Sequence, residues 1–74
     1  MPQMTRELRS YRLRAKLSQS KLARVSDLDR TTVSNAENGK EVSELTMYKL
    51  AEALSNSLGG DVSVDEIISK SIEN

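Results

Sequence analysis

The stretch that decides the fold is residues 17–40, LSQSKLARVSDLDRTTVSNAENGK. Ser18 is a typical N-cap residue, so the pattern predicts a helix over 19–25. The helical periodicity then breaks for three residues, and Asp29 is a second N-cap residue that predicts another helix over 30–38. We therefore expect two short helices joined by a tight turn.

Three further helices are expected around this pair. Apolar residues recur at three- and four-residue spacing elsewhere in the chain, whereas β-branched and aromatic residues are too scattered to indicate strands. One helix starts after Thr5, a second runs over about 44–55, and a capping box that begins at Ser63 predicts a third over about 64–71. The sequence thus predicts an all-α fold of five helices, with residues 1–74 forming one domain.

The same periodicity predicts which side chains face the core. The expected inward-facing residues are Leu8, Tyr11, Ala15 and Leu17, then Leu22, Ala23 and Val25, then Leu45, Tyr48, Leu50, Ala51 and Leu54. Val62 is expected to pack on Ile67 as a hydrophobic staple. The register of the fourth helix stays open, because either Glu44 or Leu45 can take its first core position.

Charge is distributed unevenly along the chain. Eleven basic and eleven acidic residues sum to zero, but residues 1–30 carry eight basic against three acidic residues, and residues 31–74 carry three against eight. A nucleic-acid-binding domain usually has a basic excess, so the zero sum argues against that function and the basic first half argues for it. We expect one half to face phosphate and the other to face a different partner.

Several functional classes are disfavoured by what the sequence lacks. It has no cysteine and no histidine, which removes disulfides, thiol catalysis, Cys/His zinc sites and the commonest general base. No phosphate-cradling glycine loop or activated nucleophile is recognisable, so we expect neither an enzyme nor a metal or other cofactor. No apolar run is long enough for a membrane span, and we expect a cytoplasmic protein with no membrane partner.

The segments LSQSKLA (17–23) and DRTTVSNAENGK (29–40) together resemble the helix-turn-helix of the lambda-repressor and Cro family, also called the XRE family. The resemblance covers nearly the whole chain and implies a five-helix lambda-repressor-like DNA-binding domain, with its helix-turn-helix unit at 18–38. Lys16 and Asp27 depart from the pattern, since both stand where the family usually has glycine. The loop after residue 39 also appears one residue short and lacks the usual proline.

The resemblance also implies roles for individual residues. In this family the first turn of the second helix of the unit reads base edges in the major groove. The implied base-reading residues are Arg30, Thr31, Ser34 and Asn35. The implied phosphate contacts are Gln19, Asn38 and Lys40, together with Arg9, Tyr11 and Arg14 on the first helix. For these last three, a solvated basic face is an equally good interpretation. Arg12 and Glu37 match an internal ion pair and are expected to be structural.

Two functions remain open. The first is a homodimeric repressor, Cro-like in size, that regulates transcription from a pseudo-palindromic operator on double-stranded DNA. Its dimer surface is expected in the C-terminal segment 63–72 and the connection before it, with Leu58, Val62, Ile68 and Ile72 as the contacting residues. Ile67 is expected to close the monomer core instead. The alternative is an antitoxin that binds a toxin protein and represses its own operon.

Overall fold

A computed structural model describes residues 3–4 and 7–73. Its elements in chain order are β1 (Gln3–Met4), α1 (Glu7–Arg14), α2 (Gln19–Val25), α3 (Arg30–Glu37), α4 (Glu44–Ser57), α5 (Val64–Ser71) and β2 (Ile72–Glu73). The predicted all-α class and the five helices are confirmed. The third helix ends at Glu37, one residue earlier than expected, and the fourth continues to Ser57, two residues beyond the expected end.

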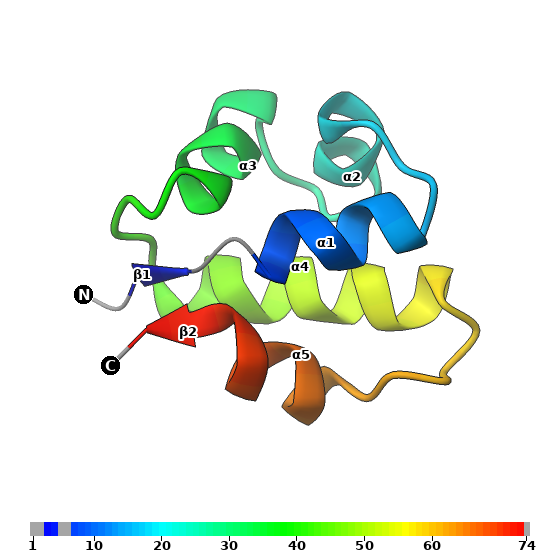
Figure 1. Ribbon diagram of the computed structural model, residues 1–74. Helices are drawn as coiled ribbons and strands as arrows, with labels where there is room; N and C mark the ends of the chain where they lie inside the picture. The colour runs from blue at the N-terminus through cyan, green and yellow to red at the C-terminus, as the bar shows by residue number, and fades with distance from the viewer. Residues whose placement is uncertain (1–2, 5–6, 74) are drawn as a thin grey trace.

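The five helices pack around one core (Figure 1). In that view α2 and α3 lie side by side at the top, α1 passes in front of α4, and α5 lies below. α4 is the longest helix, with 14 residues, and it contacts both α2 and α5. Every helix and β1 contribute to the larger fully buried side chains, which are Met4, Leu8, Leu22, Val33, Leu50, Leu54 and Ile67. This shared core fixes the orientation of α3 relative to α2.

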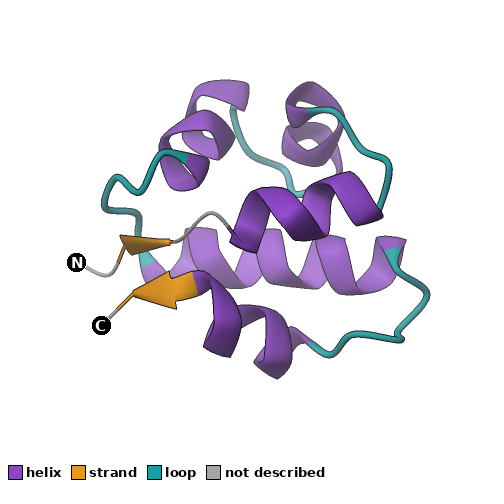
Figure 2. Cartoon of the chain, viewed as in Figure 1, coloured by secondary structure: helices purple, strands orange, loops and turns teal. Residues whose placement is uncertain are grey.

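A short antiparallel strand pair, which the sequence did not predict, joins the two ends of the described chain (Figure 2). Gln3 lies opposite Glu73, and Met4 lies opposite Ile72. A strand of two residues is too short to show the alternation by which strands are recognised in a sequence. The pair brings Met4 into the core, where its side chain is fully buried.

Side-chain caps begin most of the helices. Ser18 Oγ accepts a hydrogen bond from Lys21 N at 3.0 Å, and Ser63 Oγ accepts one from Glu66 N at 3.1 Å, as the cap assignments predicted. Asp29 is different. Its backbone has the extended conformation of an N-cap residue, but its side chain makes no capping hydrogen bond. The prediction for Asp29 is therefore right for the backbone and wrong for the side chain.

Two helices end at non-glycine residues in the left-handed conformation, Lys16 with φ 60° and Asp27 with φ 58°. At both turns the next residue donates its amide to the helix, Leu17 to Arg12 O at 3.2 Å and Leu28 to Ala23 O at 2.8 Å. This is the Schellman arrangement, in which glycine is the usual residue because it has no Cβ. Both turns therefore adopt this arrangement without glycine.

Three residues expected in the core are exposed instead: Val25 by 48%, Leu45 by 66% and Tyr48 by 48%. Val25 is the last residue of α2, beyond the turn that packs on the core. The other two are on α4, whose buried residues are Met47, Leu50, Ala51, Ala53 and Leu54. Those buried positions occupy one side of the helix, and Leu45 and Tyr48 lie on the opposite side. Glu44 is exposed too, so neither alternative for the register is correct.

Candidate nucleic-acid interface

The inner side of α3 is held by apolar packing, which leaves its outer side in solvent. Val33 and Ala36 are fully buried and face the core that α2 also lines. Arg30 and Thr31, in the first turn, are exposed, and Ser34 and Asn35, one turn later, are half-buried. The four predicted base-reading residues thus lie in the first two turns of one short helix, and the first two are the most accessible.

A buried ion pair ties α1 to the end of α3. Arg12 Nε donates to Glu37 Oε2 at 2.5 Å, and Arg12 Nη2 donates to Glu37 Oε1 at 3.1 Å. The two side chains are only 10% and 4% exposed. Arg12 Nη1 also donates to Leu17 O at 2.9 Å. One guanidinium therefore contacts both the turn that follows α1 and the end of α3. Such a bidentate pair in a buried site fixes the position of α1 relative to the end of α3.

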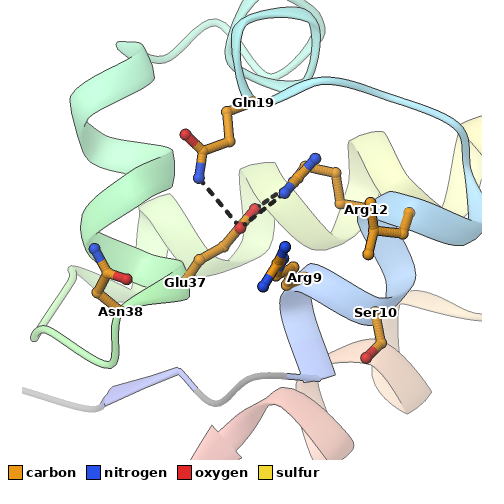
Figure 3. A pocket seen from close by; sticks show the side chains of 7 residues that line it. Arg9, Ser10, Arg12, Gln19, Glu37 and Asn38 are labelled. Carbon is orange, nitrogen blue, oxygen red and sulfur yellow. Dashed lines mark hydrogen bonds and ion pairs between the residues drawn. The ribbon is translucent and has the colours of Figure 1, made fainter.

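Hydrogen bonds extend from this pair through Gln19, which Figure 3 shows beside Glu37, to Arg30 at the start of α3. Gln19 Nε2 donates to Glu37 Oε1 at 3.2 Å, and Gln19 Oε1 accepts from Arg30 Nη1 at 3.5 Å. Gln19 is the first residue of α2, so this side chain bridges both helices of the unit. Its role as a bridge was not anticipated, because sequence spacing does not show which glutamine reaches a residue 18 positions away.

A polar pocket of about 630 Å³ opens beside the same network. Its lining residues come from α1, from the first residue of α2 and from the end of α3: Arg9, Ser10, Arg12, Leu13, Gln19, Glu37 and Asn38. In Figure 3 the Arg9 guanidinium points toward the side of the pocket that Glu37 occupies. The pocket therefore brings together five residues that were predicted for DNA contact or for the ion pair.

The exit of α3 places two more predicted residues at the surface. Gly39, with φ 79°, supplies the left-handed turn, and the following Lys40 N donates to Asn35 O at 3.0 Å. Asn38 Nδ2 lies 3.5 Å from Ser34 Oγ. Asn38 and Lys40 are both exposed, at the end of the helix opposite to Arg30.

The three predicted phosphate contacts on α1 differ in exposure. Arg9 and Arg14 are exposed, and the Arg14 guanidinium lies 5.6 Å from the centroid of the Tyr11 ring. Tyr11 itself is only 5% exposed and belongs to the core. Burial, and secondarily the negative charge of Glu66 on α5, raises the pKa of the Tyr11 hydroxyl. Burial leaves Tyr11 little surface for a phosphate contact, and its expected role there stays a prediction.

The expected dimer residues are mostly engaged within the chain. Val62 is 3% exposed and Ile67 is fully buried, so Val62 is unavailable to a second copy and Ile67 closes the core as expected. Leu58 and Ile68 are half-buried and pack against that core. The side chain of Ile72 lies outside the described residues. Val62 belongs to the core cluster, and its carbonyl accepts a hydrogen bond from Ser55 Oγ of α4 at 2.7 Å.

Comparison with known proteins places the unit in a family. A family model described as helix-turn-helix matches residues 8–60, which include α1 to α4 but not α5. Comparison with curated proteins gave no significant match, and neither did comparison with solved structures. Within the described part of the chain, none of the helices has the length and apolar character that crossing a bilayer requires.

Proposed function

This chain belongs to the helix-turn-helix family of DNA-binding transcription regulators, of the lambda-repressor and Cro type, and from this we propose that it is a homodimeric repressor. Its operator is a pseudo-palindrome in double-stranded DNA, and it acts in the cytoplasm. The observation that carries the proposal is the exposed first turn of α3, with Arg30 and Thr31 in solvent, on a helix whose other end is tied to α1 by the Arg12–Glu37 ion pair. A short, rigid helix of this kind fits a major groove about 12 Å wide.

Base recognition follows from the chemistry of the exposed side chains. Arg30 donates two hydrogen bonds to guanine, and Asn35 pairs with adenine in the same bidentate manner. The Thr31 methyl group contacts thymine, and Ser34 lies between base and phosphate. Each good bidentate pair contributes about 1–3 kcal/mol of discrimination against the wrong base. The hydrogen bond from Arg30 to Gln19 limits the conformations of the Arg30 side chain in the absence of DNA.

Phosphate contacts orient the unit on the duplex. Gln19 presents its backbone N–H at the N-terminus of α2, which carries positive partial charge. Asn38 and Lys40 contact the DNA backbone where α3 leaves the groove. Arg9 and Arg14 extend this contact along α1. Each neutralised phosphate steepens the salt dependence by about 0.9 in a log–log plot.

Two copies are needed because one such unit contacts too little DNA for high specificity. A two-fold pair places two reading helices about 34 Å apart, one turn of the duplex. Repression then requires nothing beyond occupancy, since a dimer bound over a promoter excludes polymerase from it.

The test begins with selection of bound sequences from a random DNA pool, followed by fluorescence anisotropy on the selected operator. Arg30→Ala should relax the preference at one base position per half-site. Lys40→Ala, the matched control, should weaken all sequences alike and lower the salt slope by about 0.9 for each copy. Identical behaviour of the two variants would contradict the division between base reader and phosphate contact.

The antitoxin alternative is supported by the acidic second half of the chain, where eight of the eleven acidic residues lie. An antitoxin shares the DNA contacts and adds a toxin partner. The two functions differ in one simple observation, whether the product of the adjacent reading frame co-purifies with this protein and is neutralised by it.

A further inference from the structure

The outer side of α4 carries two large apolar side chains that the fold leaves in solvent. Leu45 is 66% exposed and Tyr48 is 48% exposed, one turn apart on the same side of the helix. Both were expected in the core, yet the core is complete without them, because Met47, Leu50, Ala51 and Leu54 fill the inner side of α4. We call the surface formed by Glu44, Leu45, Tyr48 and Lys49 the α4 face.

The order of residues on the α4 face matches one repeat of a two-stranded coiled coil. Leu45 and Tyr48 have the spacing of the apolar a and d positions, and Glu44 and Lys49 take the flanking g and e positions. In a parallel pair the g residue of one helix lies beside the e residue of the next repeat on the other helix. Glu44 and Lys49 have opposite charges, so the α4 face is complementary to itself.

We propose that the α4 face is where two copies of this chain meet, around a two-fold axis that runs along the two helices. Leu45 and Tyr48 then pack against the same residues of the second copy, and Glu44 pairs with Lys49 of that copy. This inference rests on the proposed homodimer and names its contact surface. It replaces the C-terminal surface expected from the sequence, where Val62 and Ile67 are buried and Leu58 and Ile68 already pack on the core.

Charge favours a second copy over a different protein as the occupant. A surface with apolar residues and one sign of charge selects a partner of the opposite sign, whereas the α4 face holds one charge of each sign at the spacing that self-pairing needs. Lys49 is free to exchange partners. Its Nζ lies 4.0 Å from Asp27 Oδ2, and because the Asp27 side chain is fully exposed this contact contributes little.

The contact is short, and this limits its strength. The next a position is Glu52, which is exposed, and two like charges there would repel. The helices must therefore cross and separate after Tyr48. Two apolar residues per copy cover far less than the roughly 800 Å² per partner of a standard interface. Association is accordingly weak in free solution and becomes strong when DNA holds two copies at adjacent half-sites.

Disulfide trapping tests the surface directly, because the chain has no cysteine of its own. Single variants Leu45→Cys and Tyr48→Cys are oxidised on operator DNA and in its absence. Bridging requires Cα atoms within about 7 Å, which the axis provides at these two positions. Leu13→Cys is the matched control, since Leu13 is also a leucine, is 55% exposed and lies on α1. Ile68→Cys reports a dimer formed through α5 instead.

We expect covalent dimers from the two α4 variants, several-fold faster on DNA than without it, and none from Leu13→Cys. Equal trapping at Leu13, or trapping at Ile68 alone, overturns the proposal. Absence of trapping at Leu45 and Tyr48 on bound DNA overturns it as well, while leaving DNA binding intact. Loss of operator binding by the unmodified chain would instead contradict the proposed function, so the two failures are distinguishable.

A second test uses a variant that is expected to strengthen self-association through the α4 face. Glu52→Leu removes the repulsion and lengthens the apolar seam by one position, so the self-association constant measured by analytical ultracentrifugation should rise about tenfold or more. Lys21→Leu adds the same side chain at an exposed position of α2 and should leave that constant unchanged. Equal effects of the two variants would show nonspecific association and contradict the assigned surface.

Discussion

The ion pair between Arg12 and Glu37 is predicted to make this domain sensitive to the loss of either partner alone. A chain of 74 residues is expected to have an unfolding free energy of about 4–11 kcal/mol. Both side chains are at least nine-tenths buried, so replacing one leaves the other charge buried without its partner. That loss is about 3–5 kcal/mol, close to half of the total. Arg12→Met and Glu37→Met should each lower Tm by roughly 15–30 °C.

The double variant should be much more stable than either single one. With both charges gone no unpaired ion remains, and two methionines of similar length fill the space. What is lost is the Arg12 hydrogen bond to Leu17 O and the Gln19 hydrogen bond to Glu37, at about 1 kcal/mol each. The expected loss for the double variant is therefore about 2 kcal/mol.

Urea denaturation followed by far-UV circular dichroism measures all four proteins of this cycle. A coupling energy of several kcal/mol between the two positions is the expected result. Additive losses, or a single variant that loses less than about 1 kcal/mol, would refute the reasoning, since the charges would then be solvated rather than buried. Operator affinity is measured at a temperature at which all four proteins are folded, so that altered placement of Gln19 is not confused with unfolding.

Two further predictions concern the turns and α1. Lys16→Gly should raise the unfolding free energy by about 0.5–1 kcal/mol, because the left-handed strain removed exceeds the extra chain entropy of glycine, and thermal denaturation measures it. Tyr11 should titrate above 10.0, mainly because of burial, when its ring resonances are followed by NMR. Since its folded pKa is raised, its contribution to stability is complete below pH 10.0 and is lost as pH rises through the folded value, and Glu66→Gln should lower that value in part.

Sequence patterns predicted the parts of the fold that depend on local chemistry. Ser18 and Ser63 cap their helices as expected, and the Arg12–Glu37 pair lies where the family resemblance implied. These features involve short spacings or a motif that is specific as a whole. The helix-turn-helix unit could therefore be recognised, and its exposed first turn located, before the structure was known.

The errors concern choices that only tertiary packing makes. On α4, Leu45 and Leu50 have the same side chain and nearly the same local pattern, yet one is 66% exposed and the other is fully buried. Leu50 lies on the side of α4 that packs against α2 and α5, and Leu45 lies on the other side, so the neighbouring helices decide which leucine is buried. Tyr11 likewise is buried close to Glu66 of α5, which depends on where α5 returns after its connection.

The pairing of β1 with β2 also has a kinetic consequence. The contacts within and between the helices are mostly near in sequence and can form early, whereas the pair of Met4 with Ile72 closes a loop of nearly the entire chain. We expect that closure to form last in folding and, being held by two residues per strand, to open first. Each opening uncovers the Met4 thioether, so the oxidation rate of Met4 reports how often the ends of this domain separate.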